Sequence, residues 1–418
     1  MAHLRLRCGA APCCIAILTL MLAAGAACLA QSSPPVLQGV TGLQRVRRIA
    51  GENSINQTDT RWNVAGTDLG HMFDDGEKLY MVFGDTFGRG FVAPPGAGPA
   101  PDWRSNVMAV ITDRNPTDGL TFERMITDAS GNARELIPAQ RSMGEVTAIP
   151  TNGVAVPQGL VLHYMAVREW GAAGEWDLRH AGIAYSVDSG QNWQRVFWVW
   201  PSDTKFGQVA FVRRGGFVYL FGIPGGRNGG VSVARVPERD MAVRGSYRYY
   251  AGKADGEPVW SINESAAVLV VPAPVGELSV MWNAYLNRWT MTYLHGPDIV
   301  IREAPDLLGP WNAPKTVVSA RQYPGLYSPY MHPWLIEGNG EIVYFTMSEW
   351  FTYGVSLMRV RLVKRPDALT VADIARALML SGGLAESTTA DMARLGGDAD
   401  RIDLARASLL LREATGLH

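Results

Sequence analysis

Five similar segments of short apolar strands, spaced about 60 residues apart, constrain the fold of this 418-residue chain more than any other feature. They begin near residues 78, 159, 216, 277 and 341. Each is rich in β-branched and aromatic residues, and most follow a turn that contains glycine, as strands of antiparallel sheets do. Repeated β-units of this size predict an all-β fold, a five-bladed β-propeller around a central channel. A β-sandwich is the competing interpretation, but its usual strands are fewer and more evenly spaced.

Two hairpin motifs favour a propeller that handles carbohydrate. Residues 186–193 fit S-x-D-x-G-x-x-W, the Asp-box hairpin of sialidase-like and related propellers, in which Asp and Gly make the turn and Trp packs on the blade. Residues 302–311 are similar to the G-P-W hairpin of five-bladed glycosidase propellers. Both likenesses concern the fold, and neither predicts which residues do chemistry.

The first thirty residues predict export. A basic start, a short apolar run and small residues up to Ala30 are typical of a secretory signal peptide, so we expect a secreted protein, extracellular or periplasmic. All four cysteines lie in this segment, and the mature chain would therefore carry neither a disulfide nor a thiol nucleophile. A lipoprotein acylated at Cys28 is the alternative, although Gly25 stands where such signals carry a large aliphatic residue. We assign residues 31–49 to an N-terminal linker.

The composition changes abruptly near residue 365, which marks the end of a propeller domain predicted for residues 50–365. Residues 366–418 contain no aromatic residue and no lysine, and two stretches rich in Ala and Leu end at glycines, as helices do. The two stretches align with each other and resemble a degenerate dockerin, a duplicated loop-helix module with calcium loops, which would imply a protein partner. Most of its metal ligands are missing. A small helical module without metal or partner is the simpler interpretation.

Charge and motif content exclude several classes of function. Lys and Arg total 38 against 39 Asp and Glu, so the chain lacks the positive charge of a nucleic-acid binder. It has no zinc-protease, phosphate-loop, dinucleotide or serine-hydrolase motif, and its seven histidines show no metal-ligand spacing. No segment after the signal is apolar enough to span a membrane. We expect no cofactor and no metal, which leaves carboxylates as catalytic candidates and suits a glycosidase.

Two aspartates stand at the ends of strand-like runs in the first predicted blade. Asp68 lies in G-T-D-L-G and Asp85 in G-D-T-F-G, beside glycines that would let a substrate approach the backbone. If the chain between them forms a β-hairpin, the two carboxyls converge on one rim. Gly-Asp pairs are also ordinary turn chemistry, so spacing alone leaves both interpretations open.

Several longer phrases resemble one bacterial family. They are G-T-D-L-G with Y-M-V-F-G-D-T-F-G, M-G-E-V-T-A-I-P-T-N-G, G-I-P-G-G-R-N-G-G-V-S-V-A-R-V, L-Y-S-P-Y-M-H-P-W and Y-F-T-M-S-E-W. Over about residues 50–363 the chain is similar to the endo-D-arabinanases, which cut the D-arabinan of mycobacterial arabinogalactan and lipoarabinomannan. The resemblance implies a five-bladed propeller whose first blade carries two catalytic aspartates, here Asp68 and Asp85. By analogy with this family, Asp85 would be the nucleophile and Asp68 the acid/base of a retaining reaction. The sequence alone leaves the two roles interchangeable, and carboxyls about 6.5–9.5 Å apart would instead predict inversion.

Further residues in these phrases are candidates for binding the sugar. Glu145 would tune a neighbouring pKa or bind a hydroxyl, although an ordinary strand-end glutamate explains it equally well. Arg227 would reach sugar oxygens from its glycine-rich loop, unless it is a solvated loop arginine. The remaining candidates would line subsites or, instead, pack within blades: Trp62, Tyr327, Ser328, Tyr330 and His332.

The sequence thus predicts a secreted glycoside hydrolase that cleaves internal α-D-arabinofuranosyl linkages, with the polysaccharide D-arabinan as its partner. Two alternatives stay open. The first is a propeller glycosidase of another furanoside specificity, such as an L-arabinan or fructan enzyme. The second is a carbohydrate-binding propeller without catalytic activity.

Overall fold

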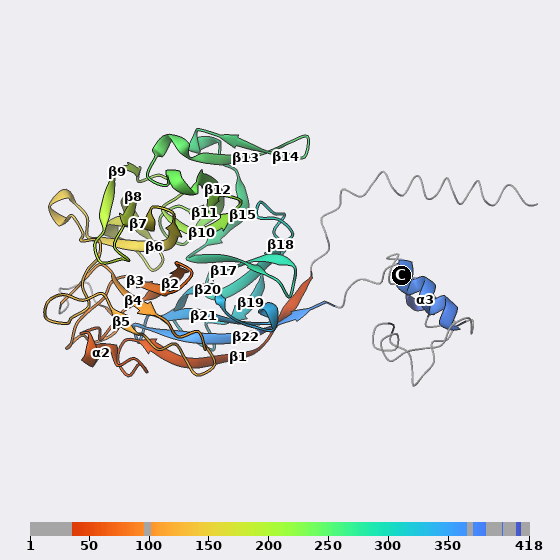
Figure 1. Ribbon diagram of the computed structural model, residues 1–418, viewed down its shortest axis with the longest axis horizontal. Coiled ribbons are helices and arrows are strands. Elements are labelled where there is room, and N and C mark those ends of the chain that lie inside the picture. The colour runs from red at the N-terminus through yellow and green to blue at the C-terminus, as the bar shows by residue number, and fades with distance from the viewer. Residues whose placement is uncertain (1–35, 96–101, 366–370, 382–394, 396–406, 411–418) are drawn as a thin grey trace, which may run out of the picture. The chain divides into compact units, whose positions relative to one another are not determined.

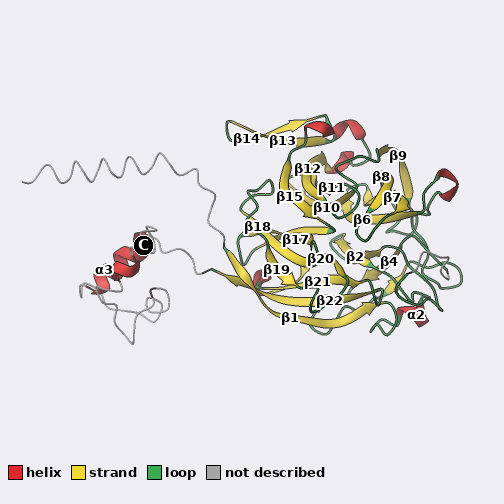
Figure 2. Cartoon of the chain, turned by 180° about the vertical axis from the view of Figure 1, so that it is seen from behind, coloured by secondary structure: helices red, strands yellow, loops and turns green. Residues whose placement is uncertain are grey.

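The computed structural model describes residues 36–95, 102–365, 371–381, 395 and 407–410. The chain divides into two compact units, Met1–Val363 and Lys364–His418. The first unit is built almost entirely from strands (Figure 2). Its five sheets are the five blades that the sequence predicted, and the all-β propeller is confirmed.

Each blade is an antiparallel sheet, and in blades 1, 2 and 4 the strands follow chain order from the channel outward. Blade 1 contains β2 (Leu69–Asp74), β3 (Leu79–Phe83), β4 (Val107–Ile111) and β5 (Arg124–Met125). Blade 2 contains β6 (Thr147–Val156), β7 (Gly159–Trp170), β8 (Trp176–Ser186) and β9 (Gln194–Trp200). Blade 4 contains β16 (Leu278–Asn283), β17 (Arg288–His295), β18 (Asp298–Ala304) and β19 (Lys315–Val318).

Blades 3 and 5 depart from this simple order. Blade 3 contains β10 (Gln208–Arg214), β11 (Phe217–Ile223), β12 (Gly229–Pro237), β13 (Arg248–Ala254) and β14 (Glu257–Ser261), and β15 (Leu269–Val275) also pairs with β12. Blade 5 contains β20 (Leu326–Glu337), β21 (Ile342–Glu349), β22 (Gly354–Lys364) and β1 (Leu37–Ala50). The short helical turns are α2 (Thr58–Arg61), η1 (Arg141–Met143), η2 (Glu238–Asp240), η3 (Arg244–Ser246), η4 (Glu264–Ala266) and η5 (Gly338–Gly340).

The innermost strands form a closed ring, because β2, β6, β10, β16 and β20 each contact the next and β20 contacts β2. Figure 1 shows β2, β6, β10 and β20 near the middle of the propeller, with β1, β5, β9 and β14 at its rim. The end of the channel at which these inner strands begin is called the site face. In every blade the loop between the second and third strands returns to this face.

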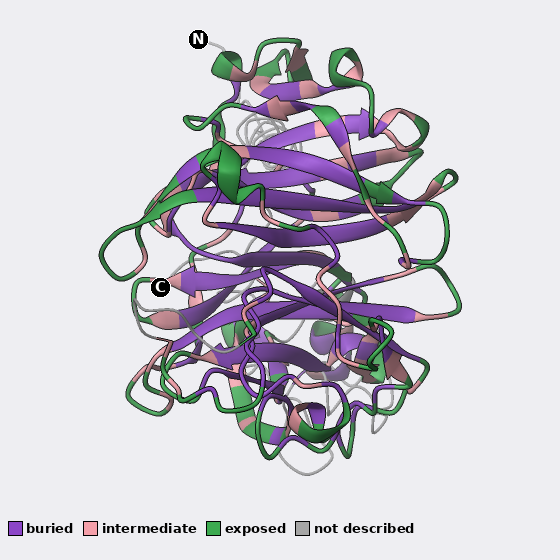
Figure 3. Cartoon of the chain, turned by 90° about the vertical axis from the view of Figure 1, so that its left-hand side faces the viewer, coloured by how far each residue is buried: buried purple, intermediate pink, exposed green. Residues whose placement is uncertain are grey.

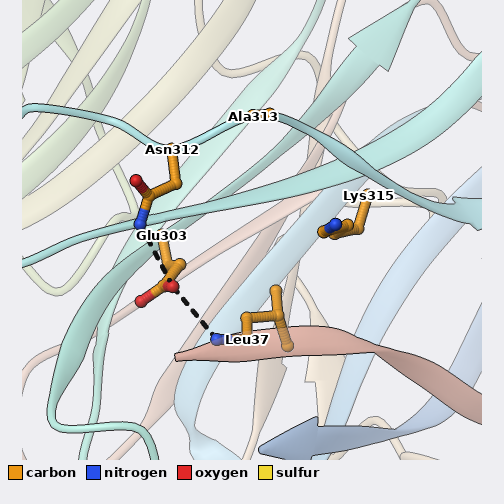
Figure 4. Close-up of a pocket in the computed structure, with 5 residues that line it drawn as sticks. All are labelled: Leu37, Glu303, Asn312, Ala313 and Lys315. Carbon is orange, nitrogen blue, oxygen red and sulfur yellow. Dashed lines mark hydrogen bonds between the residues drawn. The ribbon is translucent and has the colours of Figure 1, made fainter. Parts of the chain in front are cut away.

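Strand β1 corrects one sequence-based boundary. Residues 31–49 were expected to be a linker, yet β1 is the outermost strand of blade 5, paired with β22. Most of its residues are at least partly exposed, and this weak apolar alternation hid the strand in the sequence. Its start is held by Glu303 of blade 4, whose Oε1 accepts the N–H of Leu37 at 3.0 Å and a bond from Asn312 (Figure 4). Joining the first and last strands of the propeller in one sheet closes the ring.

Apolar side chains fill the spaces between neighbouring blades. Figure 3 shows that burial is concentrated in the strands, whereas most exposed residues lie in the loops. Between blades 1 and 2, for example, Phe73 and Tyr80 stack at 5.2 Å and share one buried cluster with Leu162 and Tyr164. Such inter-blade packing fixes the blades, and with them the loops of the site face, in one arrangement.

The predicted Asp-box hairpin joins β8 and β9. Ser186 Oγ donates a hydrogen bond to Asp188 Oδ1 at 2.7 Å, and Trp193 Nε1 donates to the Gly190 carbonyl at 3.0 Å. A connection between the third and fourth strands lies at the end of the blade opposite the site face. The motif therefore closes a turn and takes no part in the site.

The second unit contains α3 (Val371–Ser381), on which Ala377 and Leu380 are buried against Leu395, Ala407 and Leu410. Small C-terminal helices were expected here and are confirmed. The predicted signal peptide and most of the dockerin-like residues 366–418 lie outside the described residues. Among the helices that the structure describes, none has the length and apolar character needed to cross a membrane.

Candidate active site

The two aspartates singled out in the sequence lie together at the site face. Asp68 directly precedes β2 and Asp85 follows shortly after β3, so the antiparallel pairing of these strands returns both residues to one rim. The N–H of Gly84 donates to the main-chain carbonyl of Asp68 at 3.2 Å. The carboxyls are close enough for the charge of Asp85 to raise the pKa of Asp68.

Gly84 leaves the space that the Asp68 carboxyl occupies. A Cβ atom at Gly84 would lie 2.5 Å from Oδ1 of Asp68, closer than real Cβ contacts allow. The glycines beside the aspartates were expected to admit a substrate to the backbone. At Gly84 the group admitted is instead the carboxyl of Asp68, and this explains why the second motif needs glycine before Asp85.

A β-bulge sets the direction of the chain next to Asp68. Leu69 and Gly70 have φ of +65° and +81°, and the pairing of β2 with β3 shifts register between Leu69 and His71. The carbonyl of Gly70 accepts the hydroxyl of Thr346 at 3.0 Å, and that of Leu69 accepts Ser348 at 3.4 Å. Bulges with left-handed residues often re-aim side chains at functional sites, and here side chains of blade 5 hold the bulge.

The Asp68 carboxyl is partly buried and touches two tyrosines. Tyr327 Oη donates to Oδ2 at 2.9 Å, and the hydroxyl of Tyr353 lies near enough to stabilise the charged carboxyl. Oδ1 is buried and has no hydrogen-bond partner among the described residues. Burial raises the pKa of Asp68 to about 8, with the negative charge of Asp85 as the second cause, while the tyrosine hydrogen bonds act in the opposite direction. Asp68 therefore holds a proton at neutral pH.

Asp85 is buried and accepts two side-chain hydrogen bonds on one carboxyl oxygen. Trp103 Nε1 donates to its Oδ1 at 2.9 Å, and Thr147 Oγ1 donates to the same oxygen at 2.6 Å. Burial raises the pKa of Asp85 to about 6, and the hydrogen bonds of Thr147 and Trp103 oppose this increase because they stabilise the charged form. At neutral pH the pair thus consists of a protonated Asp68 and an ionised Asp85.

A third carboxylate, which sequence reasoning missed, lies beside this pair. Glu277 directly precedes β16, as Asp68 precedes β2, and its buried Oε1 accepts Nη2 of Arg227 at 2.7 Å and Nε at 3.0 Å. The guanidinium carbon of Arg227 lies 4.9 Å from the ring centroid of Tyr327. Arg227 is therefore at the site as expected, but its Nε and Nη2 donors face Glu277, and it packs against the tyrosine that binds Asp68. Comparing the residues that precede the inner strands would have identified Glu277.

Glu145 lies in an ion pair instead of facing the aspartates. Its side chain is fully buried, and its two oxygens accept Nη1 and Nη2 of Arg195 at 2.7 and 2.9 Å. Burial alone would raise the pKa of Glu145, but the hydrogen bonds from Arg195 lower it. The structure supports the strand-end interpretation that the sequence left open for this residue.

Glu145→Gln is expected to lower the free energy of unfolding by about 1–3 kcal/mol, because it leaves the Arg195 guanidinium without its charged acceptor. Urea denaturation at pH 7 measures the change. Glu123→Gln, at an exposed glutamate, is the matched control and should differ little from wild type. Equal losses in both variants would contradict a structural role for the ion pair.

Two other candidates contact residues other than the aspartates. Trp62 is buried and stacks on Phe122 with ring centroids 6.4 Å apart, so it belongs to blade packing. His332 Nε2 lies 3.1 Å from Oδ2 of Asp74, which ends β2. A six-residue strand is about 20 Å long, and the His332 contact is therefore at the far end of the channel. We therefore do not assign Trp62 or His332 to sugar binding.

Of the tyrosine-serine group, Tyr327 contacts Asp68 directly. Ser328 is buried with φ of +58°, at a register shift of β20 that resembles the bulge in β2. Tyr330 is buried behind it, with its ring edge-on to His71 at 5.9 Å. Within the described part of the chain no three His, Cys, Asp or Glu side chains gather as metal ligands, and we assign no residue to a metal or cofactor.

The fold and this carboxyl pair define a five-bladed propeller with a candidate acid site at one end of its channel. The chain belongs to the family described as Domain of unknown function (DUF4185), whose model matches residues 53–359. The search of curated proteins gave no match.

Several solved structures are similar to this chain. A candidate hydrolase from Bacteroides ovatus has 15% identity and a TM-score of 0.53, over 73% of this chain and 88% of that one. The native arabinanase Arb43A of Bacillus subtilis has 12% identity and a TM-score of 0.40, over 71% and 96%. The GH43_1 enzyme of Xanthomonas citri has 16% identity and a TM-score of 0.41, over 73% and 88%. The first likeness supports the fold.

Proposed function

We propose that this protein is a glycoside hydrolase that cleaves internal α-D-arabinofuranosyl linkages of D-arabinan. The observation that carries the proposal is the pair of neighbouring carboxyls at the site face, of which Asp68 holds its proton and Asp85 is ionised at neutral pH. Glycosidases need this combination, one carboxylic acid and one carboxylate flanking the scissile bond. The choice of D-arabinan rests on the resemblance of the sequence phrases to the endo-D-arabinanases.

The contacts of each carboxyl support a division of roles. Asp68 would protonate the leaving oxygen, with Tyr327 and Tyr353 holding its carboxyl in place. Asp85 would attack the anomeric carbon through Oδ2, because the Trp103 and Thr147 bonds both fall on Oδ1. The glycosyl–Asp85 ester would then be hydrolysed by water, with Asp68 as the base, and the product would retain its anomeric configuration.

Incubation of the mature protein with D-arabinan, L-arabinan and a fructan tests the proposal. We expect new reducing ends from D-arabinan alone, in oligosaccharides of several lengths, and proton NMR should show that the first product retains its configuration. Release of monosaccharide alone would contradict internal cleavage. Cleavage of L-arabinan or of the fructan instead of D-arabinan would assign the enzyme to that substrate. Binding without any reducing ends would favour the carbohydrate-binding alternative.

The pH dependence of kcat/KM is expected to be bell-shaped. Activity requires Asp85 to be ionised, so it should rise as the pH increases through about 6. It also requires Asp68 to be protonated, so it should fall as the pH increases through about 8. Initial rates on a soluble arabinofuranoside from pH 4 to pH 10 measure both limbs. A rate that stays constant above pH 9 would remove Asp68 as the acid.

We also propose that residues 1–30 direct export of the protein. The support is the order of basic, apolar and small residues in the sequence. Expression of the full chain in a bacterial host, followed by N-terminal sequencing of the exported protein, should find a chain that begins at Gln31. Retention of the whole protein in the cytoplasm would contradict the proposal.

A further inference from the structure

The hairpin that joins β7 and β8 carries two tryptophans beside the active site. Trp170 and Trp176 are cross-strand partners near its tip, with ring centroids 6.0 Å apart and the rings edge to face. The carbonyl of Gly174 accepts the N–H of Arg227 at 2.9 Å, which ties the tip to the Arg227 loop. The hairpin is thereby fixed next to the residues that support Asp68.

A row of three aromatic rings and one guanidinium leads outward from Asp68 along this side. Tyr327 binds Asp68, Arg227 packs on Tyr327, and the guanidinium carbon of Arg227 lies 5.7 Å from the ring centroid of Trp176. Trp170 follows at the solvent end, where 46% of it is exposed. Nearly half of this large side chain is therefore accessible to a ligand, beside a second tryptophan.

A second exposed aromatic pair lies on the other side of blade 1. The loop between β21 and β22 presents Trp350 and Phe351, which are 43% and 59% exposed. Trp350 contacts Tyr353 edge to face at 5.8 Å, and Tyr353 lies close enough to Asp68 to affect its pKa. Blades 2 and 5 are the two neighbours of blade 1 in the ring, so the two aromatic pairs flank the blade 1 aspartates.

We propose that these two pairs, Trp170 with Trp176 and Trp350 with Phe351, are sugar-binding platforms that hold a furanose polymer on both sides of the Asp68–Asp85 pair. Aromatic faces provide large, rigid apolar surfaces that suit the apolar faces of sugar rings. A polymer held on both sides has its scissile bond within the chain, so the platforms would account for internal cleavage. The identity of the polymer rests on the proposed function, whereas the binding surface does not.

Binding is tested first, in the Asp85→Asn background, so that the polymer stays intact. Affinity electrophoresis in gels containing D-arabinan or L-arabinan compares Trp170→Ala, Trp350→Ala and a control. The control is Trp282→Ala, since Trp282 is 40% exposed and contacts Trp289 edge to face at 5.4 Å, but lies near the far end of β16. We expect each platform variant to bind D-arabinan about three- to tenfold more weakly, and the control to bind within about twofold of its parent.

Catalysis provides the second readout, measured with the tryptophan variants in the otherwise wild-type protein, which retains Asp85. On D-arabinan, kcat/KM of each platform variant should fall by about three- to tenfold. On an aryl α-D-arabinofuranoside, which is too short to span both platforms, the decrease should be smaller, and the sizes of the polymer products should shift in both variants.

The outcomes separate the two proposals. Tryptophan-dependent binding without cleavage by the wild type would support the platforms and overturn the enzymatic function. Platform variants that behave like the Trp282 control, or an Asp85→Asn protein that binds neither polymer, would overturn the platforms. Equal losses on the polymer and on the aryl glycoside would also overturn them, because the tryptophans would then act on the catalytic pair itself.

Discussion

Asp85→Asn is expected to lower the turnover of D-arabinan by at least about 10³-fold, because it removes the proposed nucleophile. The amide can still accept the Trp103 and Thr147 hydrogen bonds, so the fold and the binding of polymer should survive. Reducing-end release measures the loss, and circular dichroism with affinity electrophoresis checks the fold and binding. Cleavage at near wild-type rates would exclude Asp85 from the chemistry.

Asp68→Asn distinguishes the two roles. On the polymer its rate should fall by about 10²–10⁴-fold, the usual contribution of a general acid. On an arabinofuranoside with a dinitrophenolate leaving group, which needs no proton, bond cleavage should be nearly as fast as in wild type, whereas Asp85→Asn should stay inactive. Added azide should give a glycosyl azide with Asp68→Asn if an ester on Asp85 forms. The reverse pattern would exchange the roles of the two residues.

Gly84→Ala is expected to lower kcat by about 10²-fold, although it leaves every ionisable residue in place. The new Cβ would lie 2.5 Å from Oδ1 of Asp68, so the carboxyl must move, and a displacement of about 1 Å is enough for a loss of this size. Gly245→Ala is the control, since its Cβ would meet nothing within 4 Å. Steady-state rates and thermal unfolding measure both variants.

The pH profile separates displacement of the carboxyl from simple instability. If Asp68 is pushed away from Asp85, the second cause of its raised pKa weakens, and the alkaline limb of Gly84→Ala should move to lower pH. Wild-type activity in this variant would show that the Asp68 carboxyl need not occupy its observed position. A fall in activity that merely follows unfolding would argue against a catalytic effect.

Part of the candidate site could be predicted because it is local in the chain. Asp68 and Asp85 belong to one hairpin, and a turn of known length between two strand-like runs is enough to place them on one rim. Glu277 and Tyr353 could not be found this way, since they come from blades 4 and 5 and meet Asp68 only when the ring closes. Thr147 reaches Asp85 from blade 2 for the same reason.

Closeness in sequence did not predict which residues of one strand lie at the site face. Tyr327 and His332 were grouped because they lie five residues apart, but on β20 that separation is about 16 Å of rise. Tyr327 binds Asp68 at the site face, whereas His332 binds Asp74 at the other end of the channel. Strand direction, which the ring imposes, decides which end of such a segment faces the substrate.

The sequence by itself determined the five blades and the two aspartates, because strand periodicity and turn chemistry act between residues close in the chain. Only the tertiary structure shows that β1 completes blade 5 and that Glu145 forms an ion pair with Arg195. It also explains why Asp68, and not Asp85, is protonated at neutral pH. These outcomes depend on burial and on charges contributed by other blades. Desolvation and Coulomb energies are set by distances in space, and those distances exist only once the propeller has closed.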